Sequence, residues 1–410
     1  MSYNNFKNKF AAKPAYSGAS YGGSRIAVPQ RGGSRRKFVN PGLKIDPNRF
    51  INKAQPQAEV APYVATHQFT DFAIEPILKQ NIVTKGYLTP TAIQDQTIPH
   101  ILFNKDVTGI ANTGTGKTAA FLIPLISKVL RNRQEKILIM VPTRELAMQI
   151  QDELFSFVRG LQIRSAFCIG GTSISKQVYN LRNNPSFVIG TPGRLKDLIE
   201  RRALNLGTFR TVVLDEADRM LDMGFIHDMK TILALMPTPR QTLLFSATFT
   251  PEIQNLTKQF QNQPISVSVK TQATASGIDQ DIVRFQDDTH RLDLLHDLLI
   301  DPAFNKVLVF GETKHGVEKL SKTLNERGFK SASIHGNKTQ AARQNALDQF
   351  KRDQVSILVA TDVAARGLDI PLVSHVINYD VPASYEDYVH RIGRTGRAGN
   401  TGKALTFVNR

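Results

Sequence analysis

The fold of this chain is decided by Val212-Val213-Leu214-Asp215-Glu216-Ala217-Asp218, an apolar run that ends in three carboxylates within four residues. Such a run is typical of a buried strand in a parallel sheet. Polar groups at the carboxyl end of such a strand lie where α/β sheets bind ligands. Buried carboxylates are unfavourable unless a cation meets them. The stretch therefore predicts an α/β fold with a cation at the end of this strand.

A glycine-rich loop upstream indicates which ligand brings the cation. Residues 111–118, Ala-Asn-Thr-Gly-Thr-Gly-Lys-Thr, follow the apolar stretch Val107–Ile110 and precede Ala119–Leu130, which has helical periodicity. A strand, a glycine-rich loop and a helix in that order form a phosphate-binding loop, although Ala stands here where the general pattern has its first Gly. Lys117 is expected to reach the β- and γ-phosphates, and Thr118 to offer its hydroxyl to Mg²⁺. The predicted ligand is a nucleotide with Mg²⁺.

Size and composition are those of a globular protein of two or three domains. The chain has 410 residues, of which 41% are hydrophobic. No stretch approaches the roughly 20 apolar residues of a membrane helix, and the N-terminus lacks the apolar segment of a secretory signal. The single cysteine, Cys168, excludes an internal disulfide and fits a reducing compartment, so a cytoplasmic location is expected. Cys168 lies in an apolar run and is interpreted as a packing residue rather than a nucleophile.

The positive charge is concentrated at the N-terminus. The net charge is +17, and residues 1–65 hold eleven Lys and Arg against Asp46 and Glu59. This segment is rich in Gly, Ser, Asn and Pro and has no periodic apolar face, so it is predicted to be a disordered tail. Its interleaved aromatic residues could stack on bases, and Gln30–Lys37 resembles basic, Gly-rich RNA-binding tails. Auxiliary nucleic-acid binding is favoured over a purely solubilising role because the charge has nearly one sign.

Beyond residue 65, short apolar runs alternate with amphipathic segments, which predicts two α/β domains with parallel sheets. The domains are placed at 66–270 and 278–410, joined by a polar linker at 271–277. The expected strands are Val107–Ile110, Ile137–Val141, Phe187–Ile189, Val212–Leu214 and Leu243–Phe245, then Val307–Phe310, Ala332–Ile334, Ile357–Val359, Val376–Tyr379 and Ala404–Val408. The expected helices include Glu145–Val158, Leu195–Arg201, Lys314–Arg327 and Gln340–Phe350.

A basic segment near the C-terminus suggests why a second domain is present. His390–Arg397 spaces three arginines three residues apart, which gives one cationic face on a helix. A solvated basic helix is the alternative, but Gly393 and Gly396 favour close approach of the backbone to another group. Arginines near a γ-phosphate stabilise its developing charge in other nucleoside triphosphatases. A second domain that closes on ATP would supply such arginines.

Taken together, these motifs resemble those of the DEAD-box ATP-dependent RNA helicases of bacterial type, over about Phe69 to Arg410. The resemblance implies two tandem RecA-like domains with ATP and Mg²⁺ as cofactors. The matching segments are Asp215–Asp218, Ala111–Thr118, Pro142–Ala147, Gly170–Gly171, Thr191–Arg194, Ser246–Thr248, Gln340 with Arg343, Thr361–Asp362, Ala365–Asp369, His390–Arg397, and Gly86–Gln94 with Phe69 upstream.

The resemblance also implies roles at the ATP site. Alone, Phe69 would be interpreted as a core residue and Gln94 as a polar residue at a helix start; the resemblance implies that they stack on and read adenine, with selectivity for ATP over GTP. Glu216 is expected to orient or deprotonate the attacking water. The remaining expected assignments are Mg²⁺ for Thr118 and, through water, Asp215; phosphates for Thr113, Gly114, Thr115, Gly116 and Lys117; ribose for Asp369; arginine fingers for Arg394 and Arg397; and coupling to domain closure for Asp218, Ser246, Thr248 and His390.

The implied partner is RNA, held through phosphate and ribose without reading of sequence. Local, non-processive unwinding by a monomer is expected, with an ATP-gated RNA clamp or assembly platform as the alternative and a DNA translocase as a further one. The chain ends directly after the strand Ala404–Val408, whereas relatives usually add a helix, so a shortened second domain with an exposed apolar face is expected. The expected RNA contacts are Thr143, Arg144, Gly171, Thr191, Arg194, Gln340, Arg343 and Thr361.

Overall fold

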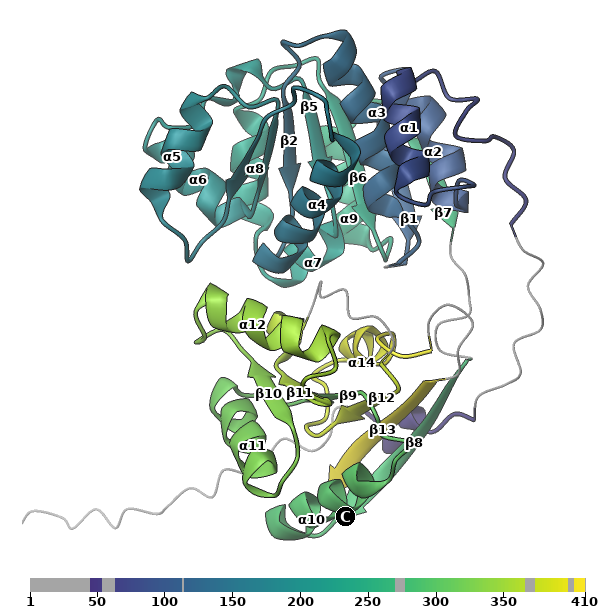
Figure 1. Cartoon of the computed structure of the whole chain (residues 1–410), viewed down its shortest axis with the longest axis vertical. Coiled ribbons are helices and arrows are strands. Elements are labelled where there is room, and N and C mark those ends of the chain that lie inside the picture. Colours follow the sequence, from purple (N-terminus) through teal and green to yellow (C-terminus); the bar gives the residue numbers. More distant parts are fainter. Residues whose placement is uncertain are drawn as a thin grey trace, which may run out of the picture. The chain divides into compact units, whose positions relative to one another are not determined.

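The computed structural model describes residues 45–53, 63–112, 114–269, 277–365, 373–396 and 402–409. Within them lie two parallel α/β sheets, each accompanied by its own helices (Figure 1). The predicted fold class is confirmed. Most of the predicted tail and of the linker lies outside the described residues. Among the described helices, none combines the length and the apolarity needed to cross a bilayer.

The first sheet has seven parallel strands in the order β3-β4-β2-β5-β6-β1-β7. Because all of them run the same way, their carboxyl ends lie along one edge, which is where such sheets bind ligands. The strands are β1 (Val107–Ala111), β2 (Ile137–Met140), β3 (Ser165–Cys168), β4 (Phe187–Gly190), β5 (Thr211–Leu214), β6 (Gln241–Ser246) and β7 (Ile265–Val269).

Helices cover both faces of this sheet, so its central strands are buried on both sides. Side chains alternate along β2: Ile137 and Ile139 belong to one core, Leu138 and Met140 to the other. This explains why the strands appear in sequence as continuous apolar runs. The helices are α1 (Pro76–Thr84), α2 (Ala92–Leu102), α3 (Lys117–Arg131), α4 (Arg144–Phe157), α5 (Ile174–Arg182), α6 (Pro192–Glu200), α7 (Ala217–Asp222), α8 (Ile226–Ala234) and α9 (Pro251–Phe260), with a short 3₁₀ helix η2 (Leu206–Thr208).

The second sheet has six parallel strands in the order β10-β11-β9-β12-β13-β8. Its strands are β8 (Ile278–Phe285), β9 (Val307–Phe310), β10 (Ser331–Ile334), β11 (Ile357–Ala360), β12 (His375–Asn378) and β13 (Gly402–Asn409). Its helices are α10 (Asp288–Ile300), α11 (Lys314–Glu326), α12 (Gln340–Lys351), α13 (Asp362–Ala365) and α14 (Tyr385–Ile392).

All ten predicted strands are present, and the three that the sequence did not predict are edge strands. β3 and β7 end the first sheet, and β8 ends the second. An edge strand has partly exposed side chains, and β7 indeed reads Ile-Ser-Val-Ser-Val with only Val267 buried. β7 and β8 lack the continuous apolar run that marks a central strand, whereas β3 (Ser165–Cys168) shares the apolar run around Cys168 and was not predicted.

The exposed apolar face expected on the second domain does not lie on β13. Leu405 and Phe407 are buried in one core of the second sheet, and Ala404 is buried in the other. Leu295 and Leu299 of α10 belong to the same core as Phe407, so this helix covers that face. The described residues of β13 are thus covered on both faces, and an exposed apolar face elsewhere on the second domain stays a prediction.

Part of the predicted tail belongs to the second domain. Pro47–Phe50 form a short 3₁₀ helix, η1, and Phe50 is fully buried in the core of the second sheet. The isolated apolar residues Ile45 and Phe50 show no helical or strand period, so the sequence pattern gave no sign of this packing. The structure thus moves residues 45–53 out of the tail.

A buried histidine makes the stability of the second domain depend on pH. His375 on β12 stacks on Phe304 with ring centroids 3.8 Å apart, and burial lowers its pKa from 6.5 to about 4. Above pH 6.5 the ring is neutral in both states. As the pH falls towards 4, only the unfolded chain binds the proton, so stability falls by about 1.4 kcal/mol per pH unit.

We expect His375→Phe to remove this pH dependence while keeping a ring on Phe304. Urea unfolding of both proteins between pH 7.5 and pH 4.5 measures the effect. The stability advantage of the wild-type chain over the variant should shrink as the pH falls. Parallel pH profiles for the two proteins would contradict the assignment.

Candidate functional site

The motif residues of the first domain divide along the carboxyl edge of the sheet. The phosphate loop follows β1, the acidic residues follow β5, and Ser246–Thr248 follow β6. The candidate RNA residues follow β2, β3 and β4. Since β5 pairs with both β2 and β6, the two groups occupy adjacent halves of one edge.

The phosphate loop has the backbone geometry that its glycines allow. Gly114 and Gly116 have φ values of +86° and +90°, in the left-handed region that side chains disfavour. Gly116 immediately precedes α3, and the side chain of Gln94 lies directly against it, so that a Cβ at Gly116 would overlap the Gln94 amide. Thr113 lies outside the described residues.

Gln94 holds this loop in the structure. Its side chain is fully buried, accepts a hydrogen bond from the Thr91 N–H at 2.9 Å and donates one to the Gly116 carbonyl at 3.1 Å. Phe69 is 3% exposed and packs edge-on against Phe72 and Tyr87. The structure therefore gives Gln94 a role in shaping the loop and Phe69 a role in the core, and adenine recognition by either stays a prediction.

Lys117 and Asp215 form the buried charged centre of this edge. The Lys117 ammonium donates to the Ala111 carbonyl at 2.9 Å and is nearly inaccessible to solvent. Burial raises the pKa of Asp215 to about 6, against the opposing effect of the Lys117 charge. A carboxylate in this position favours a cation nearby.

The donor set fits Mg²⁺ carried by a nucleotide rather than held by protein alone. No group of three or more His, Cys, Asp or Glu side chains that could bind a metal occurs among the described residues. Mg²⁺ typically uses one or two carboxylates together with substrate phosphates and water. Asp215 and the Thr118 hydroxyl are the protein groups that would contact Mg²⁺.

Glu216 lies in a strained turn and is paired with an arginine. Its φ and ψ of 52° and 49° are left-handed, which is uncommon for a residue with a side chain. Its carboxylate accepts a hydrogen bond from Arg219 at 2.6 Å, and both side chains are 6% exposed. Arg219 is not among the predicted site residues, although its position one helical turn after Glu216 is a signal for the pair.

Asp218 connects the acidic motif to the end of β6. Its carboxylate accepts hydrogen bonds from the Ala247 N–H at 3.0 Å, and from the Thr248 N–H and hydroxyl at 2.9 and 3.1 Å. Burial raises the pKa of this carboxyl, but Lys117, Arg219 and the Thr248 N–H outweigh burial, and the pKa lies below its ordinary value. Ser246 is fully buried at the end of the same strand. The structure thus brings Asp218, Ser246 and Thr248 together, whereas His390, the fourth residue predicted to couple nucleotide and conformation, lies on α14 of the second domain.

The candidate RNA residues after β2 and β3 form a compact cluster. Gly171 has a φ of +76°, and a Cβ there would overlap the Arg144 guanidinium. Arg144 therefore lies on the Gly170–Gly171 backbone, which only glycine permits. Thr143 caps α4, accepting a hydrogen bond from the Leu146 N–H at 3.2 Å. The Thr143 hydroxyl is thus already used within the fold.

The two candidates after β4 are placed by α6. Thr191 is the residue before this helix, and its N–H donates to the Cys168 carbonyl at 3.1 Å. Arg194 lies in the first turn, 3.6 Å from the Asp197 carboxylate. Cys168 is itself fully buried, which raises the pKa of its thiol to about 12 and confirms it as a packing residue.

In the second domain, Arg391, the first of the three arginines in His390–Arg397, is the centre of a buried network. Its guanidinium meets the Asp362 carboxylate in two hydrogen bonds of 2.6 and 2.7 Å, and also donates to Asn378 and to the Asp380 carbonyl. Arg391 is only 2% exposed. It therefore joins α14 to α13 and to the end of β12.

The remaining candidates of the second domain sit on neighbouring elements. Gln340 begins α12 and Arg343 follows one turn later, while Thr361 follows β11, its N–H bonded to the Ile334 carbonyl at 3.3 Å. His390 lies on α14, and Arg394, two residues beyond its end, is 3% exposed. Asp369 and Arg397 lie outside the described residues.

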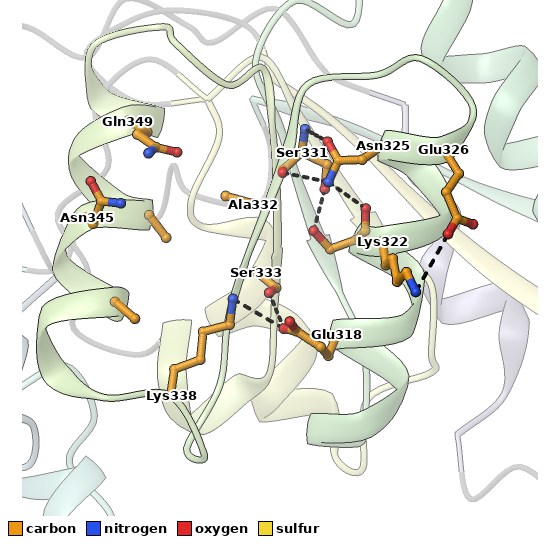
Figure 2. A pocket seen from close by; sticks show the side chains of 13 residues that line it. Glu318, Lys322, Asn325, Glu326, Ser331, Ala332, Ser333, Lys338, Asn345 and Gln349 are labelled. Carbon is orange, nitrogen blue, oxygen red and sulfur yellow. Dashed lines mark hydrogen bonds and ion pairs between the residues drawn. The ribbon is translucent and has the colours of Figure 1, made fainter.

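A separate polar cavity of about 670 Å³ lies between α11, β10 and α12 (Figure 2). Glu318 in its lining accepts a hydrogen bond from the Ser333 hydroxyl at 2.5 Å and lies 2.9 Å from His335 and 3.2 Å from Lys338. Hydrogen bonds from Ser333 and His335 lower the pKa of Glu318 to about 2. None of the predicted site residues lines this cavity.

Two family models match the chain. The model described as DEAD/DEAH box helicase matches residues 91–256, and the model described as helicase conserved C-terminal domain matches residues 290–399. The first therefore contains the phosphate loop and the acidic motif, and the second contains α14.

Curated proteins and solved structures show the same likeness. The chain is 46% identical over 343 residues to the ATP-dependent RNA helicase CshA of Listeria monocytogenes, covering 83% of this chain and 66% of that protein. It is 47% identical over 345 residues to the DEAD-box ATP-dependent RNA helicase CshA of Bacillus subtilis, covering 84% and 70%. The chain thus spans about two thirds of the length of these relatives.

Among solved structures, the DEAD-box helicase Mss116 bound to single-stranded RNA and UDP-BeF aligns with a TM-score of 0.75 at 30% identity, covering 83% of this chain and 74% of that one. Dbp5 of S. cerevisiae bound to RNA and ADP BeF3 aligns with a TM-score of 0.73 at 29% identity, covering 83% and 89%.

The Glu216–Arg219 pair yields a prediction about stability. We expect Arg219→Ala to lower the free energy of unfolding by about 3–5 kcal/mol, because it leaves a buried carboxylate without its partner. Chemical denaturation of the first domain measures this. Adding Glu216→Gln to Arg219→Ala should recover much of the loss, because the uncompensated charge is then gone. Equal losses for the single and the double variant would show that the pair itself does not matter.

Proposed function

The chain belongs to the DEAD-box family of helicases, and from that premise we propose that it is an ATP-dependent RNA helicase that opens or remodels short stretches of RNA. The observation that carries this proposal is the layout of the first sheet. The nucleotide motifs end at β5, and the candidate RNA residues begin at the adjacent strand β2. One edge can therefore bind both ligands next to each other.

The nucleotide proposed for this edge is ATP with Mg²⁺. The loop amides and Lys117 would hold the β- and γ-phosphates, and Thr118 and Asp215 would meet the cation. Mg²⁺ supplies neutralisation of charge on the phosphates when bound. Glu216, which is adjacent to Asp215 at the end of the buried strand, is the residue we assign to the attacking water. The charge of Lys117 opposes the rise that burial causes in the pKa of Asp215 and of Asp218, which supports a shared site for phosphate and cation at this edge.

The second domain would complete the site through α14. We assign Arg394 and Arg397 as arginine fingers that stabilise charge on the transferred phosphoryl group, an effect worth about 10³–10⁵ in rate in other nucleoside triphosphatases. Support comes from the buried Arg391–Asp362 pair, which fixes α14 against its own domain. The hydrogen bonds between Asp218 and Thr248 would couple the bound nucleotide to the conformation of the first domain.

RNA would be held mainly through its backbone by Arg144, Arg194 and Arg343. Gly171 would contact it through main-chain atoms. Contacts to phosphate position a strand without reading its sequence, and contacts to the 2′-hydroxyl distinguish RNA from DNA. ATPase activity that RNA stimulates and DNA does not would separate this proposal from a DNA translocase. The basic residues 1–44 would add binding without specificity.

The first test removes the proposed base. We expect Glu216→Gln to lower RNA-stimulated ATP hydrolysis by a factor of about 10²–10⁴, the range usual for a positioned general base. ATP and RNA binding should persist, because Lys117, the loop and the arginines are unchanged. Steady-state phosphate release and fluorescence binding assays measure the two effects.

The matched control is Glu252→Gln, which makes the same change at an exposed glutamate in the first turn of α9. Its hydrolysis rate should equal that of the wild-type chain. Unchanged hydrolysis in Glu216→Gln would remove Glu216 from the role of base.

The second test concerns the length of duplex that one closure can open. Stacking is worth about 1.4 kcal/mol per base-pair step, so opening a few pairs costs several kcal/mol and opening many pairs exceeds one round of ATP use. We expect unwinding rates to fall steeply from a short to a long duplex that carry the same single-stranded overhang. Equal rates would contradict local unwinding. ATP-dependent retention of RNA with neither duplex opened would favour the RNA clamp.

A further inference from the structure

The segment Ile45–Lys53, which we call the N-terminal strap, packs on the second domain although it precedes the first in sequence. Phe50 of the strap is fully buried, and its ring lies 4.7 Å from that of Tyr388 on α14. Phe50 and Tyr388 are among the largest fully buried side chains of the chain. The strap is thus part of the core of the second domain (Figure 1).

Backbone pairing fixes the register of the strap. Asn52 and Gln280 exchange two hydrogen bonds, of 2.9 and 2.7 Å, as an antiparallel bridge on the edge strand β8. The strap therefore caps part of an edge that would otherwise be open. Lys53 lies 3.5 Å from Asp279 and 3.8 Å from Asp281, so charge complements the pairing.

Three contacts direct the strap onto α14 in particular. The Arg49 guanidinium lies 4.0 Å from the centre of the Tyr385 ring. Phe50 packs on Tyr388, one turn further along the helix. The Tyr388 hydroxyl donates to the Gln280 side chain at 2.9 Å, and Gln280 is the bridge partner of the strap. Both tyrosines in the N-terminal half of α14 therefore contact the strap, and Tyr388 also contacts Gln280, the residue that pairs with the strap.

Arg394, which is assigned to the nucleotide, lies two residues beyond the C-terminal end of the same helix. Arg391, one turn after Tyr388, is fixed by Asp362, and Gly393 separates Arg394 from the helix end at Ile392. A shift of the tyrosine end of an eight-residue helix moves its arginine end as well, because a helix this short behaves as a rigid rod.

The chain leaves the strap and then enters the first domain. Tyr63 donates from its hydroxyl to Asp95 of α2 at 2.6 Å, and Asp95 also accepts from the Thr66 N–H at 2.7 Å. Along the sequence, the strap that packs on the second domain therefore comes before the first domain. Ordering a segment so far in sequence from β8 costs closure entropy, which the burial of Phe50 and the pairing of Asn52 must offset.

We propose that the N-terminal strap is a positioning element of the ATPase, and that Phe50, through Tyr388, sets the place of Arg394. The proposal rests on the function proposed above. Phe50 touches neither nucleotide nor RNA in this scheme, so it is a positioning residue. Its loss should affect turnover more than nucleotide affinity.

The first experiment asks whether the strap is docked, independently of activity. In hydrogen exchange of the full chain, the amides of residues 45–53 should be protected in the wild-type protein and exchange rapidly in Phe50→Ala. Rapid exchange of this segment in the wild-type chain would overturn the proposal.

The second experiment measures RNA-stimulated ATP hydrolysis. We expect Phe50→Ala to lower kcat by about 10- to 100-fold, the loss typical of a catalytic group displaced by about 1 Å, with the KM for ATP unchanged. Ile51→Ala is the matched control, because Ile51 is the next residue of the strap and is 43% exposed. It should retain wild-type kinetics, and Phe50→Tyr should recover most of the lost rate.

A double-mutant cycle separates positioning from general destabilisation. If the strap acts through Arg394, Phe50→Ala should cause no further loss in a chain that already carries Arg394→Ala. Losses that multiply would overturn the proposal.

Asn52→Pro provides a second route should Phe50→Ala fail to fold. It removes one of the two bridge hydrogen bonds that dock the strap without truncating the Phe50 side chain. Because the strap then no longer holds Phe50 against Tyr388, the variant should show the same fall in kcat and the same dependence on Arg394. A wild-type chain without RNA-stimulated hydrolysis would refute the proposed function, whereas an active wild-type chain with an unaffected Asn52→Pro variant would refute only the strap.

Discussion

Three carboxylates buried at the carboxyl end of β5 must each be compensated, and much of the first domain is arranged to do so. Asp215 lies near the Lys117 ammonium, Glu216 is paired with Arg219, and Asp218 accepts three hydrogen bonds from the end of β6. An uncompensated buried charge would cost several kcal/mol. The three solutions differ, and the difference is chemical: one carboxylate is suited to a cation, one is held in a strained turn, and one ties two strands together.

The strand order places the residues proposed for the nucleotide next to those proposed for RNA, along one edge of the sheet. β5 lies between β6 and β2, so the phosphate loop and the coupling residues fall on one side of it, and the Arg144 cluster falls on the other. A parallel sheet brings all these groups to one edge without any of them being near in sequence. Close packing then fixes details, such as the Arg144 guanidinium on the backbone of Gly171 and the Gln94 amide against Gly116.

The second domain depends on a comparable constraint at α14. Arg391 is buried and would be costly there without Asp362, Asn378 and the Asp380 carbonyl. The same helix buries Tyr388 against Phe50 at its other end. A helix fixed at both ends would hold Arg394, which follows it, with little freedom, as the proposed arginine finger requires, since preorganised charge needs no rearrangement during the reaction.

The sequence by itself determined the fold class, the ten strands that have apolar runs, the phosphate loop and the acidic motif. Each of these is a local pattern of hydrophobicity, glycine or charge. Only the tertiary structure decided the edge strands β3, β7 and β8, and the half-exposed positions of β7 and β8 leave no such pattern. It also decided the partners of Glu216, Asp218 and Arg391, and the packing of Phe50 on Tyr388. These pairings join residues distant in sequence or side chains of ordinary type, and their energy comes from burial and close contact, which appear only once the chain is folded.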